Sequence, residues 1–567
     1  MSLIPTVDDR SPLWRLLICF ILGIVLAEYF PKTSLWSILG IFFLFSNSIY
    51  LIFRNQVPKQ GASSPFAPIK RHGTTFLHTG LFLSMFTFYA QWRFPPPLEE
   101  ENFNPGWHTL DIRLQRVYAR KRLHNYQIYG QGILVDSPSL PSKFRKQRLY
   151  FMLYEDTPQA HYRGQILRVR AHLQCLEKRT YKPHSFETYL QRVRIPLQID
   201  RGNIQTLLCE GPVFFRCCYQ LQQHALAILA IDNKDTHILR CLLLNDRACV
   251  SRSQKQLFSR TGIAHLLAIS GLHIGIIGLM LEYFFRLFRL SKKQRRIPCI
   301  LILGLYTCVI GIPPSALRAF LMLAYAWSAC FFSRRTTTLS AISFSGIMAL
   351  LIAPHQLWDL GFQLSYIAVF CIILIGSLLA SYTSYWLRLR STFEKGPSRA
   401  TPWKKFLRYV LFYGLQSSCI SAPISLLTIP LSIEYFGSFS LSGIFINLIA
   451  IPLAFGLITV GFSTLMLGLF LGDACSQWIL SHLLLPYAQN FERILHWCDL
   501  HLPYFWGQQT LAAGTGITAF LIMCALSLIF HHHRLKNFLK TQTYRIAMLT
   551  EDTFSSRDMP YFTNRSS

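Results

Sequence analysis

The chain has 567 residues, of which 51% are hydrophobic and 15% are charged, and its formal net charge is +29. A soluble chain of this length would carry about a quarter charged residues. Here the apolar residues come in blocks of about 20, which at ~1.5 Å per helical residue is enough to cross a hydrocarbon core of ~30 Å. This composition excludes an ordinary soluble protein and predicts a membrane protein.

The predicted membrane-spanning helices begin close to the N-terminus. The block at 13–30 lacks a cleavage site of the A-x-A type and a second block follows almost at once, so we expect it to be retained and not removed as a signal peptide. Pro452 divides the longest block, 441–471, and we therefore expect this block to form a broken helix. The block at 476–497 carries Glu492 and Arg493, so it either crosses the membrane or lies in its interface. The other predicted spans are 35–53, 76–92, 263–285, 297–312, 316–332, 339–353, 360–382, 409–431, 441–471 and 511–530.

Four connecting segments are basic and nearly free of acidic residues, which predicts that they face the cytoplasm. Counting spans from these segments places residues 94–262 outside the cytoplasm and leaves the side of the C-terminal tail open. Residues 94–210 nevertheless carry 18 Lys and Arg against 11 Asp and Glu. An excess of positive charge on the outer side predicts an acidic partner there. The four basic segments are 54–71, 286–296, 334–335 and 384–408.

Residues 110–205 read as short strands separated by turns. Apolar side chains such as Leu149, Phe151 and Leu153 alternate with polar ones, a period of two that is typical of half-buried strands. About five strands in this length favour a small barrel such as the OB-fold, which commonly binds single-stranded nucleic acid. Basic and aromatic side chains on its solvent face would neutralise phosphates and stack on bases; the alternative is a solvated basic face without a ligand. The predicted DNA-binding residues are Arg148, Tyr150, Arg168 and Arg170.

The fourth predicted span begins with a stretch of regularly spaced small residues. They recur at intervals of three and four, which places them on one stripe of a continuous helix and predicts close contact with another helix. His265 and His273 lie on the same predicted helix, about two turns apart. Polar groups at membrane depth face either protein or a water-filled path, so the two histidines either line a path or form hydrogen bonds within the bundle. The small residues are Ala264, Ala268, Gly271, Gly275 and Gly278.

Three further polar clusters occur at 313–318, 358–365 and 434–447, all at predicted outer ends of spans. Helix ends accept polar residues at little cost, so one cluster alone carries little weight. Together with His265 they predict an outward-facing vestibule. The residues predicted to line or pack the path are His265, Ser270, Gly271, His273, Gly275, Arg318, Asp359, Gln363 and Asn447.

The stretch His265–Gly275, which reads HLLAISGLHIG, resembles the signature of the ComEC family of competence proteins. That family passes incoming DNA through the inner membrane as a single strand, and the resemblance implies the same activity here. It covers about residues 1–530, and its motifs follow the family's order. The other matching segments are 164–169, 182–195, LLLNDR at 242–247, PSALRAFLM at 314–322, GFQLSYIAV at 361–369 and NLIAIP at 447–452.

Several chemical motifs are absent from the 567 residues. Many family members carry an HxHxDH zinc cluster in a metallo-β-lactamase-like domain, and this sequence contains no such cluster. Residues 531–533 are three consecutive histidines, which point in different directions on a helix and are better read as a basic membrane anchor than as a metal site. There is no Walker A loop, HExxH or GxSxG. We therefore expect a channel and not an enzyme, with no metal or cofactor; Cys175 and Cys209 could pair if the barrel faces an oxidising compartment.

The sequence therefore predicts a polytopic α-helical membrane protein of about 10–12 spans with an inserted small all-β OB-like domain. We expect it to transport single-stranded DNA across the cytoplasmic (inner) membrane during natural transformation, in contact with lipid. The expected partners are other competence proteins, namely a DNA receptor, a cytoplasmic helicase or translocase and a separate nuclease, and a second copy in a homodimer. The alternatives are a transporter or channel for another anionic solute and a membrane-embedded metalloenzyme that uses His265, His273 and Asp359.

The predicted domains follow from these assignments. They are three N-terminal spans at 1–93, an OB-like extracytoplasmic domain at 94–210, an amphipathic linker at 211–262, a competence-type channel domain at 263–530 and a polar tail at 531–567.

Overall fold

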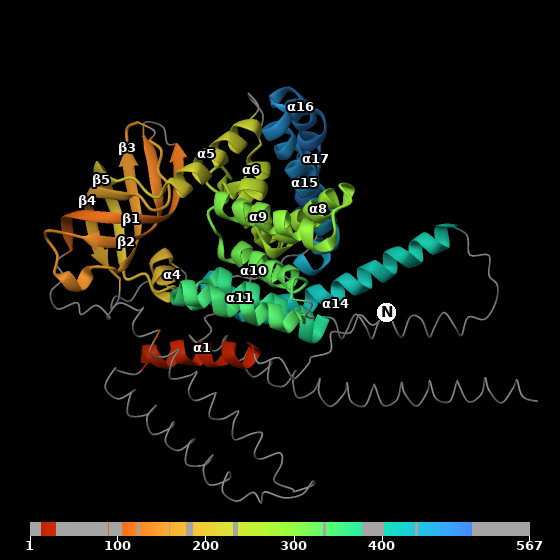
Figure 1. Cartoon of the computed structure of the whole chain (residues 1–567), viewed down its shortest axis with the longest axis horizontal. Helices are drawn as coiled ribbons and strands as arrows, with labels where there is room; N and C mark the ends of the chain where they lie inside the picture. The colour runs from red at the N-terminus through yellow and green to blue at the C-terminus, as the bar shows by residue number, and fades with distance from the viewer. Residues whose placement is uncertain are drawn as a thin grey trace, which may run out of the picture.

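The computed structural model describes residues 13–29, 89, 105–121, 125–157, 159–176, 185–230, 236–332, 336–376, 402–436, 440 and 442–501. The spans predicted at 35–53 and 511–530, almost all of the span at 76–92 and the tail at 531–567 lie outside the described residues. A β-barrel lies beside a large helical region (Figure 1).

Five strands form a closed barrel in the order β1-β2-β3-β5-β4. Neighbouring strands are antiparallel except for β3 and β5, which are parallel. Leu110, Ile112, Leu149, Phe151 and Val169 point inward and are fully buried. The barrel and its alternating pattern confirm the prediction from the sequence. The strands are β1 (Gly106–Lys121), β2 (Tyr126–Asp136), β3 (Arg148–Glu155), β4 (Ile166–Cys175) and β5 (Leu197–Cys209).

A short helix, α4 (Phe186–Arg192), connects β4 to β5 and lies between the barrel and the helical region (Figure 1). Its N-cap residue Ser185 accepts a hydrogen bond from the backbone N–H of Thr188 at 3.2 Å, a standard helix start. Tyr189 of α4 packs against apolar residues of both the barrel side and the helical region. The helix therefore contacts both the barrel and the helical region and connects them.

The helical region contains several layers of packed helices. The described helices before residue 262, apart from α4, are α1 (Leu13–Tyr29), α5 (Val213–Ile228), α6 (His237–Leu244) and α7 (Arg252–Arg260). Those that follow are α8 (Gly271–Leu287), α9 (Lys292–Val309), α10 (Pro314–Ser328), α11 (Thr338–Ile352), α12 (Leu360–Cys371), α14 (Pro402–Phe436), α15 (Gly443–Leu471), α16 (Asp473–Ile479) and α17 (Leu485–His501).

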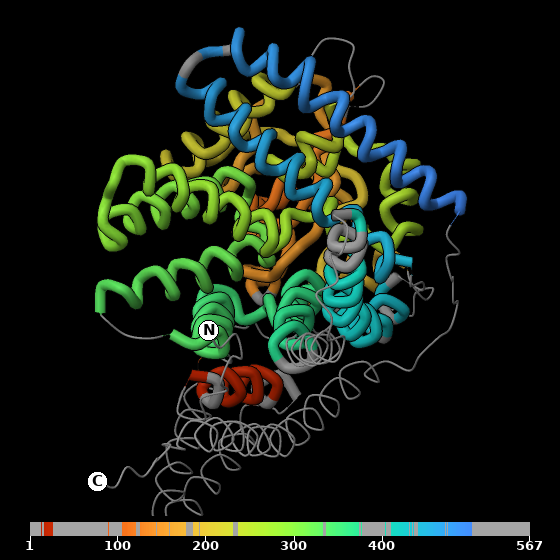
Figure 2. Tube along the Cα trace, turned by 90° about the vertical axis from the view of Figure 1, so that its right-hand side faces the viewer, coloured from red at the N-terminus to blue at the C-terminus, as the bar shows by residue number. Residues whose placement is uncertain are grey.

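Three apolar clusters hold these helices together. One joins α5, α6 and α7 to α15 and α17, a second joins α8, α9, α10 and α15, and a third joins α1, α11 and α12. Figure 2 shows α15 and α17 side by side. The segment 211–262, predicted to be an amphipathic linker, thus folds into three helices that belong to the helical bundle.

Two described helices contain segments long and apolar enough to cross a membrane, Val410–Ile429 in α14 and Gly443–Phe470 in α15. Shorter apolar segments occur at Leu16–Val25, Thr338–Ile352 and Leu360–Cys371. The prediction of a broken helix at Pro452 was wrong, because α15 continues through it as one helix of 29 residues. Next to this proline the helix packs against α17, where the hydroxyl of Tyr487 donates to the carbonyl of Leu453 at 2.9 Å.

Candidate nucleic-acid interface

The membrane motif at 262–278 begins with a short 3₁₀ turn, η3 (Ala264–Leu267), and α8 starts only at Gly271. Ala268 between them has extended backbone angles. The N–H of Ser270 donates to Nδ1 of His273 at 3.2 Å, so the side chain of His273 caps the start of α8. The prediction of one continuous helix was therefore wrong: the extended backbone at Ala268 ends the turn, and Ser270 caps the start of a new helix.

The break in the motif separates its two histidines. The side chain of His265 is exposed on η3, whereas that of His273 is completely buried in α8. Because Nδ1 of His273 accepts the Ser270 hydrogen bond, its proton is on Nε2 in the neutral ring. Within the described part of the chain, that buried Nε2 has no hydrogen-bond partner. His273 therefore offers a donor that the described fold does not use.

The glycines of the small-residue stripe differ in how closely other side chains approach them. A Cβ atom on Gly271 would lie 3.0 Å from Nη2 of Arg318, and one on Gly278 would lie 3.2 Å from the Trp327 ring. A Cβ atom on Gly275 would meet no atom of the described residues within 4 Å. Gly271 and Gly278 are therefore closely packed, whereas the described residues show no such contact at Gly275.

Arg318 lies where three of the sequence motifs meet. It is 5% exposed, its Nη1 donates to the carbonyl of Ser365, and its guanidinium lies 5.5 Å from the centre of the Tyr366 ring. The motifs at 314–322 and 361–369 are thus joined to the start of α8 through this one side chain. Its Nε has no partner among the described residues, so a buried cation faces mainly a carbonyl and an aromatic ring.

In the described part of the chain, Gln363 and Asn447 make no polar contact with Arg318, Ser365 or His273. The Nε2 of Gln363 donates to the carbonyl of Leu357 at 3.0 Å, and its Oε1 is buried without a partner in the described structure. The Oδ1 of Asn447 is likewise buried and unpartnered there. Each therefore leaves one acceptor unused inside the helical region.

Asp359 contacts the barrel. It caps α12 by accepting from the N–H of Gly361 at 2.8 Å, and it pairs with Arg116 of β1 at 3.5 Å. Beside it, the guanidinium of Arg194 lies 5.3 Å from the centre of the Trp358 ring. We call the group Arg116, Arg194, Trp358 and Asp359 the barrel junction.

Arg148 and Tyr150 lie next to the barrel junction, beneath α4. Nη1 of Arg148 donates to the carbonyl of Val193 at 3.0 Å, and the ring of Tyr150 packs edge-on against Phe186 with centroids 4.7 Å apart. Burial, aided by the charge of Arg116, lowers the pKa of Arg148 to about 10, so it remains charged at neutral pH. The prediction that these two residues lie on an open solvent face was wrong.

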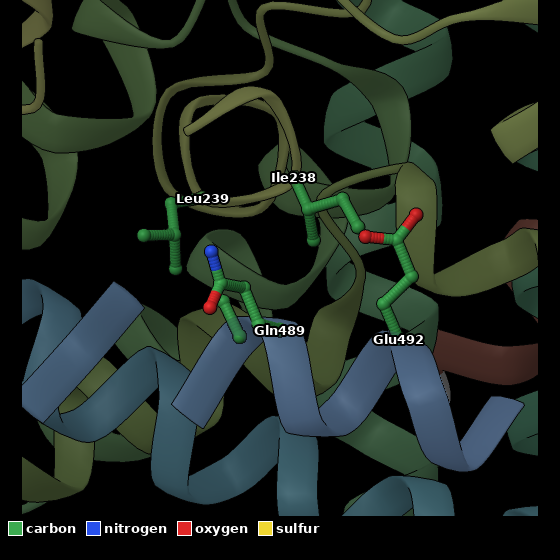
Figure 3. Close-up of a pocket in the computed structure, with 5 residues that line it drawn as sticks. Ile238, Leu239, Gln489 and Glu492 are labelled. Carbon is green, nitrogen blue, oxygen red and sulfur yellow. The ribbon is translucent and has the colours of Figure 1, made fainter. Parts of the chain in front are cut away.

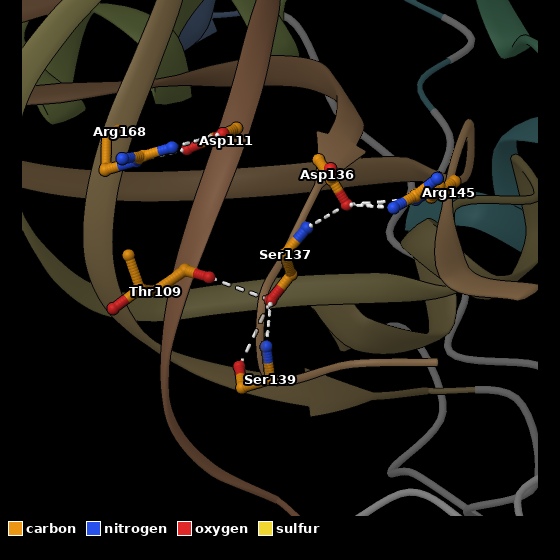
Figure 4. A network of polar contacts seen from close by, with 7 residues as sticks. All are labelled: Thr109, Asp111, Asp136, Ser137, Ser139, Arg145 and Arg168. Atoms are coloured by element: carbon orange, nitrogen blue, oxygen red, sulfur yellow. Dashed lines mark hydrogen bonds and ion pairs between the residues drawn. The ribbon is translucent and has the colours of Figure 1, made fainter. Parts of the chain in front are cut away.

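Arg168 and Arg170 lie on β4, on another side of the barrel. Arg168 forms a bidentate ion pair with Asp111, with distances of 2.8 and 2.9 Å (Figure 4), and this hydrogen bond raises its pKa. Arg170 is exposed. Since β5 lies between β3 and β4 in the barrel, the four predicted DNA-binding residues do not share one surface.

An aromatic pair beside the junction is not among the site residues predicted from the sequence. Tyr118 of β1 and Tyr129 of β2 are stacked, with centroids 5.6 Å apart and an interplanar angle of 27°. Burial raises the pKa of the Tyr129 hydroxyl, with smaller effects from Tyr118 and from Asp246 and Arg247 of the 242–247 motif. Alternation of basic and aromatic residues in β1 was the signal that could have revealed this pair.

Cys175 and Cys209 do not form a disulfide, because they lie at opposite ends of the β4–β5 ladder.

A small pocket lies away from the barrel, between α6 and α17 (Figure 3). Its Glu492 accepts from Gln254 at 3.1 Å, and no predicted site residue lines it. Among the described residues, no group of three or more His, Cys, Asp or Glu side chains is placed to hold a metal ion.

Comparison with known proteins gives the family. ComE operon protein 3 of Bacillus subtilis (strain 168) is 29% identical over 248 residues, which cover 43% of this chain and 31% of that protein. An uncharacterized protein of Aquifex aeolicus (strain VF5) is 30% identical over 149 residues, which cover 25% of this chain and 34% of that protein. The alignments thus span about a third of each curated relative, and no solved structure matches. The family model named Competence protein matches residues 242–532. Because that match covers more than half of the sequence, the chain belongs to the competence protein family, and its relationship to ComE operon protein 3 places it in the ComEC group.

Proposed function

We propose that this protein is a channel that passes single-stranded DNA across the cytoplasmic (inner) membrane during natural transformation. In this proposal it is a polytopic protein of about 10–12 spans, with residues 94–262 on the outer side. The five proposed segments have the boundaries predicted above, 1–93, 94–210, 211–262, 263–530 and 531–567, and the helices of 211–262 pack on the channel segment. The barrel collects the strand, and the helical region conducts it.

The observation that carries this proposal is the position of Arg318. Three family motifs converge on a guanidinium that is 5% exposed and that no carboxylate of the described residues neutralises. A buried charge is costly unless a counter-charge is supplied. A passing phosphodiester supplies that charge transiently, and the unpartnered Nε of Arg318 and Nε2 of His273 provide hydrogen-bond donors.

The barrel junction supports the same path. The ion pair between Arg116 and Asp359 joins the barrel to the N-terminus of α12, and α12 carries Ser365, which accepts from Arg318. The barrel is therefore attached to the same helix that holds the buried cation. A strand released at the junction has basic and aromatic groups beside it, including Tyr118, Tyr129 and Arg194.

The proposal also defines what must be supplied by other proteins. Directional movement requires an energy source, which we assign to a cytoplasmic helicase or translocase. A DNA receptor would deliver the strand, and a separate nuclease would degrade its complement. A second copy of this chain could complete the pore as a homodimer.

The test is strand entry into vesicles that contain the purified full-length protein. Single-strand-binding protein trapped inside the vesicles retains any strand that enters, and external nuclease removes the rest. We expect a labelled oligothymidylate to become protected, duplex DNA to stay outside and Arg318→Met to reduce entry. Failure of the inserted wild-type protein to admit the strand contradicts the proposal. Equal passage of small organic anions in both variants would favour an anionic-solute transporter.

A further inference from the structure

A second basic and aromatic surface lies on the barrel, away from α4. The three strands β1, β4 and β5 are neighbours, and their register aligns Trp107 with His172 and His172 with Arg201. The next outward row aligns Thr109, Arg170 and Asn203. We call Trp107, Arg170, His172 and Arg201 the outer barrel face.

The side chains of this face are available to a ligand. Trp107 is 59% exposed, and Arg170 and Arg201 are exposed as well. The indole contacts the ring of His172 edge-on, with centroids 6.1 Å apart and an interplanar angle of 68°. This contact orients the indole while more than half of it stays open to solvent.

The charge of the outer barrel face is suited to an anion. Asp111 is occupied by its bidentate contact with Arg168. Asp200 accepts from Nε2 of Gln198 at 2.6 Å, and burial raises its pKa, an effect that the nearby His172 and Arg201 partly oppose. The two exposed guanidinium groups are diagonal neighbours on adjacent strands, with Cα atoms about 7–8 Å apart.

The barrel face on which OB-folds usually bind a strand is partly covered in this protein. OB-folds bind oligonucleotides on the face of strands 2 and 3. Here β3 is covered, since Tyr150 packs on Phe186 and Arg148 donates to Val193. The outer barrel face on β1, β4 and β5, in contrast, keeps Trp107, Arg170 and Arg201 open to solvent.

We infer that the barrel binds incoming single-stranded DNA on the outer barrel face. Trp107 stacks on a base, and Arg170 and Arg201 contact the flanking phosphates. An exposed indole beside two cations supplies both components of sequence-independent strand binding. This inference rests on the proposed function and specifies where the strand first binds.

The test measures binding of a fluorescein-labelled oligothymidylate to the full-length protein in nanodiscs, by anisotropy over a series of salt concentrations. Loss of one stacked base by Trp107→Ala should weaken binding roughly 5- to 160-fold, and Trp107→Phe should restore most of it. Removing two phosphate contacts by Arg170→Gln with Arg201→Gln should lower the log–log salt slope by about 1.4.

Matched controls are available on the helical region. Phe214 of α5 is 52% exposed, so Phe214→Ala removes an exposed aromatic ring elsewhere. Arg252 and Lys255 are exposed on α7, so changing both to Gln removes two charges elsewhere. These controls should bind the strand like the wild type.

The outcomes separate this inference from the proposed function. Normal affinity and salt slope in the outer-face variants, with wild-type thermal midpoints, would overturn the inference. Loss of binding in Tyr129→Ala alone would place the strand at the barrel junction, which also overturns the inference but leaves the proposed function standing. A wild-type protein that binds no strand at any salt concentration would contradict the proposed function itself.

Discussion

Replacing Gly271 with leucine should separate α8 from α10, whereas the same change at Gly275 should be tolerated. At Gly271 the first added atom lies 3.0 Å from Nη2 of Arg318 and 3.5 Å from Cβ of Ala319. The guanidinium cannot easily retreat, because it is held by the carbonyl of Ser365. Overpacking of this kind costs about 1–3 kcal/mol.

Gly275 lies four residues further along the same helix and provides the matched control. Nothing among the described residues lies within 4 Å of its added Cβ. Gly275→Ala should raise helix stability by up to about 1 kcal/mol through intrinsic propensity, and Gly275→Leu should remain close to the wild type.

The assay is thermal unfolding of the purified protein in detergent, followed by strand entry into vesicles. We expect a lower midpoint and reduced entry for Gly271→Leu, and wild-type behaviour for Gly275→Leu. Equal destabilisation by both leucines would refute the reasoning, since it would mean that α8 is packed equally tightly along the whole stripe.

Three further predictions concern the cap, the junction and the topology. His273→Ala should cost about 1 kcal/mol in thermal stability through the lost cap, while His273→Gln should keep the cap; if both pass DNA normally, the free Nε2 has no role in transport. Asp359→Asn should keep the α12 cap but weaken the attachment of the barrel to the helical region, and faster hydrogen exchange in α4 would reveal this. The control Asp136→Asn, which breaks the surface pair with Arg145, should leave hydrogen exchange in α4 unchanged. Periplasmic-type reporters fused at 150 and cytoplasmic-type reporters fused at 292 should both be active, and activity of the opposite pair would contradict the topology.

The positions of the helices could be predicted wherever an apolar block is bounded by clear signals. The block at 297–312 is found in α9, and the helix begins earlier because Ser291 and Gln294 form a capping box. That box is visible in the sequence as a serine followed three residues later by a glutamine. Alternation in the strands likewise predicted the barrel, because one face of each strand must be buried.

The arrangement of the candidate site could not be predicted in the same way. Alternation shows that Arg148 on β3 and Arg168 on β4 both point out of the barrel. The same pattern occurs on a strand that faces solvent and on a strand that is covered by another segment. Whether a surface is open depends on which other segment covers it. Arg148 is covered by α4, which begins 38 residues later in the chain. Regular spacing also cannot distinguish Gly271 from Gly275, because the difference between them is the position of Arg318 beside Gly271.

The parallel pairing of β3 with β5 has a consequence for biogenesis. β5 is the last strand to be synthesised, yet it fits between β3 and β4 and completes the ring. Until Cys209 has emerged, β3 and β4 each keep an unpaired edge, and such edges invite pairing with other chains. Closure also depends on contacts between segments distant in sequence, which slows folding. The nascent barrel therefore passes through a vulnerable interval during membrane insertion, in which we expect a chaperone on the side where it emerges to improve its yield.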